Sequence, residues 1–328
     1  MVRRFNLADV LLIKRLQRQG AYLDLETALL WTPPPLWVAL MDYFSLNEGR
    51  SCTLVLNRSS VQGFVQAWDR ADRMASDVIC LAPSPGASSG PSGLWHDLLE
   101  RLCVDKGEQG VQRIFARAPD DQAAIDVFRK LGFVTYARQR IFRLQQVPAD
   151  LDPPHTPLFR PLQKRDAWAF QQLRSSLTPR PVQQAEGGVK EERNLAGLAP
   201  WWKSPGVREY VWAEGDAIQA YLRLVVGGEY QWLRIMLGPE AQHQADAVLS
   251  EALALLSAHA VQGIYCGVPE YEPGLQGALT ELGFQPFASE SLMMKQTTVR
   301  VGVQVSKLST ALDKQVETAA PVSRSSNG

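Results

Sequence analysis

The chain has 328 residues, 45% of them hydrophobic and 21% charged, a composition typical of soluble globular proteins. This length favours two domains, each large enough to bury a core. The 34 basic and 34 acidic side chains cancel. Composition therefore predicts neither a nucleic-acid partner nor a membrane partner.

Cysteine spacing and apolar runs narrow the class further. The cysteines show no C-x-x-C pair, so we expect buried reduced thiols and no metal site; they are Cys52, Cys80, Cys103 and Cys266. The N-terminal apolar stretch is interrupted by Asp9 and Lys14, which predicts an amphipathic helix and not a signal peptide. We therefore expect a cytoplasmic protein.

The first half reads as alternating helices and strands. In chain order, the patterns predict a helix at 7–18, a rigid Pro-rich break at 31–37, strands at 52–56, 61–68 and 77–82, a Pro/Gly/Ser loop at 83–93, a helix at 94–104, a strand at 113–117, a short helix before residue 132 and a strand at 134–144.

The second half repeats this order. It predicts a strand at 159–162, a helix at 164–177, an irregular segment at 178–205, strands at 209–213, 217–226 and 230–237, a helix at 244–259, a strand at 264–268, a helix at 274–282 and strands at 287–295 and 299–305.

Proline spacing and tail composition place the domain boundaries. The sequence predicts domains at 1–146 and 158–305, a stiff proline-rich linker at 147–157 and a disordered tail at 306–328.

An internal repeat is the most informative feature. Residues 120–133 and 271–284 each read as a short amphipathic helix that ends in Leu-Gly-Phe, and they lie 151 residues apart. Gly132 and Gly283 stand where a helix end favours a positive φ.

The repeated helix resembles the C-terminal motif of the GNAT acetyltransferases, Asn-x-x-Ala-x-x-x-Tyr-x-x-x-Gly-Phe. The resemblance implies an α/β (α+β mixed sheet) fold with two tandem acyl-CoA N-acyltransferase-like (GNAT) domains. In that family the fourth and fifth strands part, and the pantetheine arm of acetyl-CoA pairs with the exposed backbone. An acceptor amine attacks the thioester, and a Gly-rich loop at the next helix holds the pyrophosphate.

In the first copy, the resemblance implies that the pairing strand is Ile79, Cys80, Leu81 and Ala82. Carried over in the same way, the residues around the pyrophosphate are Ser88, Ser89, Gly90, Ser92 and Gly93. This loop lacks the family's arginine. The motif's Asn position is Asp121, Ala124 matches, and the tyrosine position is Phe128, for which we expect a core role.

In the second copy, the pairing strand implied by the resemblance is 234–237 and the loop is 238–243. Glu240 is repulsive towards phosphate, and His243 is the one histidine that merits a test as a phosphate contact. The Asn and tyrosine positions are Glu272 and Leu279. This copy departs further from a phosphate cradle than the first.

No catalytic residue is assigned. General-base candidates are Asp69, Asp72 and Asp77 in the first copy and Glu214 and Glu229 in the second. The pairs Trp31/Trp37 and Trp201/Trp202 occupy matching places, over an acceptor pocket or in a core.

Two functional hypotheses remain open. The first is an N-acyltransferase that moves an acyl group from acetyl-CoA to a small amine. The second is a catalytically inactive acyl-CoA-binding or scaffolding protein, because both copies lack parts of the motif. The oligomeric state is not predicted.

Overall fold

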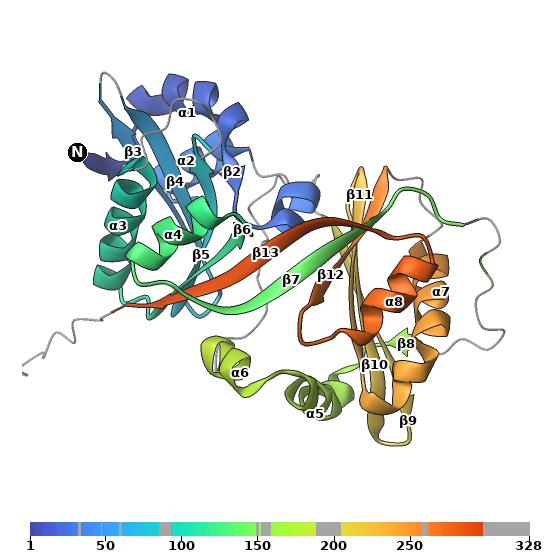
Figure 1. The fold of residues 1–328 in the computed structure, drawn as a ribbon. Helices are drawn as coiled ribbons and strands as arrows, with labels where there is room; N and C mark the ends of the chain where they lie inside the picture. The colour runs from blue at the N-terminus through green and yellow to red at the C-terminus, as the bar shows by residue number, and fades with distance from the viewer. Residues whose placement is uncertain are drawn as a thin grey trace, which may run out of the picture.

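The computed structural model describes residues 1–31, 34–46, 48–58, 61–84, 93–148, 151, 159–187, 205–256 and 262–297. Its helices and strands form one elongated molecule with two similar halves (Figure 1). The predicted tail at 306–328 and the strand at 299–305 lie outside the described residues, as do Trp201 and Trp202 and most of the linker.

A 13-stranded sheet runs through both halves. The first half supplies β1 (Val2–Arg4), β2 (Ala21–Tyr22), β3 (Ser51–Asn57), β4 (Gln62–Asp69), β5 (Ala75–Ala82), β6 (Arg113–Pro119) and β7 (Val134–Leu144). The second half supplies β8 (Arg160–Pro161), β9 (Gly206–Glu214), β10 (Ala217–Val226), β11 (Tyr230–Leu237), β12 (Gly263–Pro269) and β13 (Gln285–Gln296).

The two halves exchange their last strands. Along the sheet the order is β1-β3-β4-β5-β6-β13-β7-β12-β11-β10-β9-β8, with β2 paired to β5. The second half's β13 therefore pairs with β6, and the first half's β7 pairs with β12 (Figure 1). The domain bounds at 1–146 and 158–305 stay a prediction. In the sheet, each half is completed by a strand from the other half.

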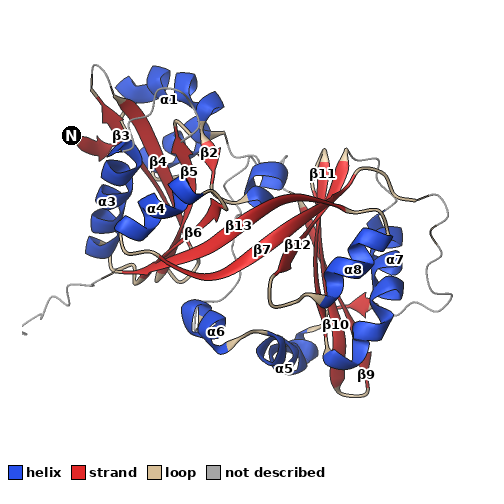
Figure 2. Ribbon diagram, viewed as in Figure 1, coloured by secondary structure: helices blue, strands red, loops and turns tan. Residues whose placement is uncertain are grey.

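One face of the sheet carries the repeated helices (Figure 2). They are α3 (Gly93–Glu108), α4 (Gln122–Lys130), α7 (Ala245–Leu256) and α8 (Gly274–Glu281). Each half has its own core beneath them. Gly132 and Gly283 end the repeated helices at φ +83° and +87°, which confirms the predicted turn.

The opposite face carries α1 (Val10–Leu16), α2 (Pro35–Tyr43), α5 (Ala167–Leu177) and α6 (Arg180–Glu186), with the short helices η1 (Leu7–Asp9), η2 (Gln17–Gln19), η3 (Thr27–Trp31) and η4 (Lys164–Asp166). A third apolar cluster on this face joins the halves, from Leu30 and Ile79 to Val225 and Trp232. The short helix η6 (Pro239–Gln244) leads directly into α7 and packs in the core beneath it.

Two helices fall in segments predicted as irregular. The break at 31–37 contains the start of α2, and the segment 178–205 contains α6. Both helices carry proline in their first turn, where the missing N–H costs no hydrogen bond. Reading these prolines only as breaks was wrong.

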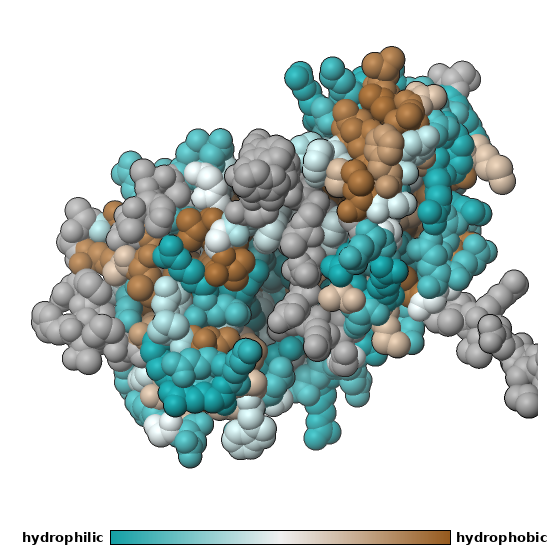
Figure 3. Space-filling model, turned by 180° about the vertical axis from the view of Figure 1, so that it is seen from behind, coloured by the Kyte–Doolittle hydropathy of each residue, from teal (hydrophilic) through white to brown (hydrophobic). Residues whose placement is uncertain are grey.

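Exposed apolar side chains gather on one part of the first half. Seen from behind, a hydrophobic patch lies over the region of α1 and α2 (Figure 3). Leu11, Phe44 and Leu46 are each more than half exposed there.

Candidate functional site

In the first half, β5 and β6 part along their length. Ala75–Asp77 of β5 pairs in parallel with Arg113–Phe115 of β6, and beyond these residues both strands continue without pairing to each other. A bulge at Ile79 interrupts the pairing of β5 with β4, since Gln66 faces Cys80 and Ala67 faces Val78. We call the space beyond Asp77 and Phe115 the first gap.

The chain itself fills the first gap. Ala21 pairs with Leu81 and Tyr22 pairs with Cys80 on the edge of β5. The Leu23 amide donates to the Ile79 carbonyl at 2.8 Å, and the Leu23 carbonyl accepts from the Arg117 amide at 3.2 Å. Residues 21–23 therefore bridge both strands, as a ligand backbone would.

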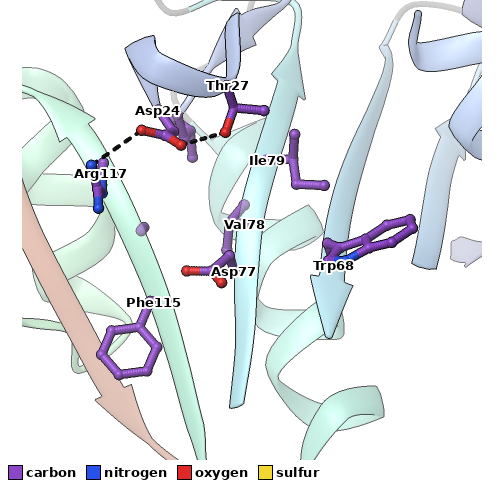
Figure 4. A pocket seen from close by; sticks show the side chains of 10 residues that line it. Asp24, Thr27, Trp68, Asp77, Val78, Ile79, Phe115 and Arg117 are labelled. Carbon is purple, nitrogen blue, oxygen red and sulfur yellow. Dashed lines mark hydrogen bonds and ion pairs between the residues drawn. The ribbon is translucent and has the colours of Figure 1, made fainter. Parts of the chain in front are cut away.

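This arrangement corrects the expected free edge at Ile79, Cys80, Leu81 and Ala82. A small cavity of about 10 Å³ remains between the strands, room for about one water molecule (Figure 4). Of the other predicted contacts, Gly93 begins α3, while Ser88, Ser89, Gly90 and Ser92 lie outside the described residues. A thioester reaches this edge only if β2 leaves it.

Charged side chains surround the filled gap. Arg117 Nη1 lies 3.3 Å from Asp24 Oδ1, and the Thr27 hydroxyl donates to Asp24 (Figure 4). Glu290, from the exchanged strand β13, accepts from the Leu25 amide at 2.8 Å. Burial, and then the nearby Asp24 charge, raise the pKa of Glu290 to about 7.

The second half repeats the parting of strands. The parallel pairing of β11 with β12 is limited to Tyr230–Leu233 of β11 and Gly263–Cys266 of β12. Among the described residues, no strand pairs with the β12-facing edge at 234–237. We call this space the second gap. Its strand β11 carries no bulge in its pairing with β10.

Side chains lie across the second gap. Arg234, from β11, makes a bidentate ion pair with Glu272 at 2.8 and 3.2 Å. Arg234 Nη1 also lies 3.4 Å from the Gly267 carbonyl of β12. The negative charge predicted at Glu272 is therefore neutralised by an arginine from the neighbouring strand.

The loop before α7 forms no backbone phosphate cradle in its first residues. The Gly238 amide donates to the Gln219 carbonyl at 2.7 Å, the Ala241 amide donates to the Gly238 carbonyl, and Pro239 has no amide hydrogen. Glu240 and His243 are both exposed. A phosphate role for His243 stays a prediction.

The remaining candidates do not converge on one site. Asp69 binds the buried Lys106 ammonium at 2.6 Å, and Asp77 binds Arg70, so both have structural ion partners. Asp72 accepts from the Met74 amide in a turn. Glu214 and Glu229 are exposed at strand ends.

The predicted core roles on the repeated helices are confirmed. Phe128 is fully buried and contacts the rings of Trp95 and Phe133, and Leu279 is fully buried in the second core. All four cysteines are buried and free, and burial raises the pKa of Cys80 and Cys266 to about 12.

A second sequence repeat was missed. Arg3 binds Asp9 at 2.6 and 2.8 Å, and Arg160 binds Asp166 at 2.7 and 2.8 Å. Both arginines belong to a first strand, and both aspartates close a capping box. The shared pattern, Arg-x-x-Asn/Gln-x-x-Asp, is readable in the sequence and marks the start of each copy.

The described part of the chain holds no group of three or more His, Cys, Asp or Glu side chains placed to bind a metal ion. None of its helices combines the length and the apolar character that crossing a bilayer needs.

No protein-family model and no curated protein matches this sequence. Solved structures do match its fold. A GCN5-related N-acetyltransferase from Sphaerobacter thermophilus aligns with a TM-score of 0.52 and 14% identity over 90% of this chain and 95% of that chain. A putative acetyltransferase from Pyrococcus horikoshii aligns with a TM-score of 0.51 and 12% identity over 91% and 90%. The chain therefore has the GNAT (GCN5-related N-acetyltransferase) fold, as its repeated motif predicts.

Proposed function

We propose that the chain is an N-acyltransferase that uses acetyl-CoA or a related thioester on a small amine, and that the second gap is its thioester site. The observation that carries the proposal is the difference between the two gaps. The edge of β5 that faces the first gap is paired with β2, whereas among the described residues no strand pairs with the β12-facing edge of β11 at 234–237. An extended pantetheine arm has backbone to pair with only at the second.

The reaction needs little from the protein beyond position. The amine nitrogen attacks the thioester carbonyl, a C–N bond forms, the C–S bond breaks, and the amine proton leaves to solvent or a carboxylate while the thiolate takes up a proton. Backbone amides at the gap would stabilise the oxyanion. Arg234 and Glu272 lie beside this position, on β11 and before α8.

The loop before α7 supports a particular mode of binding. The amides of Gly238 and Ala241 already donate hydrogen bonds within the protein, and Pro239 has no amide hydrogen. The pyrophosphate of CoA therefore finds few free backbone donors in these residues. We therefore expect the pantetheine arm to supply most of the affinity.

Calorimetry and hydrogen exchange on the full chain test this proposal. Acetyl-CoA should bind once per chain and protect backbone amides at 234–237, with no protection at 79–82. S-acetylpantetheine should bind, and adenosine 3′,5′-bisphosphate should not. Absence of heat and of protection at both edges would sink the proposal.

The second candidate function is a catalytically inactive scaffold with the same fold. It is favoured by β2 in the first gap and by the Arg234–Glu272 pair across the second. Thiol release from acetyl-CoA with a panel of small amines separates the two functions, because a scaffold releases none above the rate without protein.

A further inference from the structure

The strand exchange brings two buried polar side chains together where the halves meet. Glu290 of β13 lies opposite Gln139 of β7 in the sheet register. Gln139 Nε2 donates to Glu290 Oε2 at 2.7 Å, and both residues are buried. The two residues are 151 apart, the same spacing as the repeated Leu-Gly-Phe helices.

The Glu290 side of this pair holds the segment that fills the first gap. Its other carboxylate oxygen accepts from the Leu25 amide, just after β2. The charged groups that face Glu290 are Asp24, from that same segment, and Arg117, from β6. The position of residues 21–25 is therefore tied to β13.

The Gln139 side of the pair lies at the second gap. Gln139 Oε1 is 3.6 Å from the point where a Cβ on Gly267 would lie, and the Trp232 ring is 3.1 Å from the same point. The Gly267 carbonyl in turn lies next to Arg234. The amide of Gln139 and the indole of Trp232 thus form part of one floor beside the proposed thioester.

We propose that Gln139 and Glu290 are positioning residues that link the two gaps, so that the strand filling the first gap and the floor of the second respond together to one proton. The link itself rests on the contacts of Glu290 with Leu25 and Gln139, and of Gln139 with the surroundings of Gly267. Its consequence for catalysis rests on the function proposed for the second gap.

Hydrogen-bond chemistry explains how one proton acts at both ends. An ionised Glu290 accepts from Leu25 and from Gln139, as in the structure. When the proton sits on Oε2 of Glu290, this O–H faces Gln139, which can accept only through its Oε1, after its amide turns over. The NH₂ group then faces Gly267 and Trp232 in place of the oxygen. The raised pKa of Glu290, about 7, puts this exchange in the neutral range.

NMR titration of the full chain without ligand tests the link. The Leu25 backbone amide and the Trp232 indole N–H should shift with one shared midpoint near pH 7. Glu290→Gln should abolish both titrations. Gln139→Met should abolish the titration of Trp232 and keep that of Leu25. Trp232→Phe identifies the indole signal. If Gln139→Met does not fold, Gln139→Asn replaces it in this comparison.

Separate midpoints, or a Trp232 titration that survives in Gln139→Met, would overturn the link. These readouts use no acetyl-CoA, so they fail or succeed independently of the proposed function. If acetyl-CoA does not bind but both signals titrate together, the function is wrong and the link stands. If acyl transfer occurs, kcat/KM of the wild-type protein should change with pH near pH 7, and in Glu290→Gln this change should be absent.

Discussion

The first and second gaps have the same frame and different contents. In both, a parallel strand pair holds for three or four residues and then parts. Backbone from residues 21–23 fills the first gap, whereas the side chains of Arg234 and Glu272 cross the second. The comparison teaches that parted strands alone do not make a ligand site. What pairs with their free edges decides it.

The largest expected effect concerns the strand that both halves share. A chain that ends at Gly283 lacks β13, so β6 and β7 lose the strand that pairs with both of them, and the first core loses Met293. We expect no cooperative unfolding transition in this variant. A chain that ends at Thr297 keeps every described strand and is the matched control. Thermal unfolding measures this difference, and a cooperative transition in the shorter chain would mean that each half completes its own sheet.

The segment that fills the first gap should contribute to stability as part of the hydrophobic core. Leu23 is 1% exposed and packs in the first core, so Leu23→Ala should lower the free energy of unfolding by about 3–4 kcal/mol. Urea denaturation measures this loss. Leu25→Ala, at a partly buried neighbour, is the control and should cost less. A loss below about 1 kcal/mol for Leu23→Ala would mean that the segment is loosely held.

The buried Glu290 makes stability depend on pH. Its folded-state pKa, about 7, lies above the ordinary value of 4.5, so folding favours the protonated form. Stability should therefore fall as pH rises from about 4.5 to 7, by at most roughly 3–4 kcal/mol, and stay level above. Glu290→Gln should remove this slope in urea denaturation at pH 5, 6.5 and 8.5. The exposed Glu240→Gln should keep it.

The smallest effect compares the repeated Arg–Asp pairs at the start of each copy. Asp9→Asn and Asp166→Asn should each cost about 1 kcal/mol, because the capping role is partly kept and the arginines are partly exposed. The Arg160 hydrogen bonds lower the pKa of Asp166 to about 2. Its contribution should therefore persist at neutral pH and disappear as pH falls from about 4 to 2. Chemical denaturation of each variant measures both costs, and a much larger loss at one site would show that the two pairs are not equivalent.

Local pattern predicted most of the elements. Strands β7, β10 and β11 begin and end where alternation of apolar residues placed them, and the two Leu-Gly-Phe helices end at the predicted glycines. These features depend on residues a few positions apart. Strand β2, by contrast, has only two residues and no alternation to detect. Its role in the first gap was therefore not predicted.

The sequence by itself determined the order of helices and strands, the internal duplication and the fold it implies, because periodicity, turn glycines and prolines act locally. Only the tertiary structure decided which strand each half borrows, what fills each gap, and that Glu290 meets Leu25 across 265 positions. Such pairings depend on which distant edges and buried polar groups satisfy one another when the chain packs, and no local pattern records that choice.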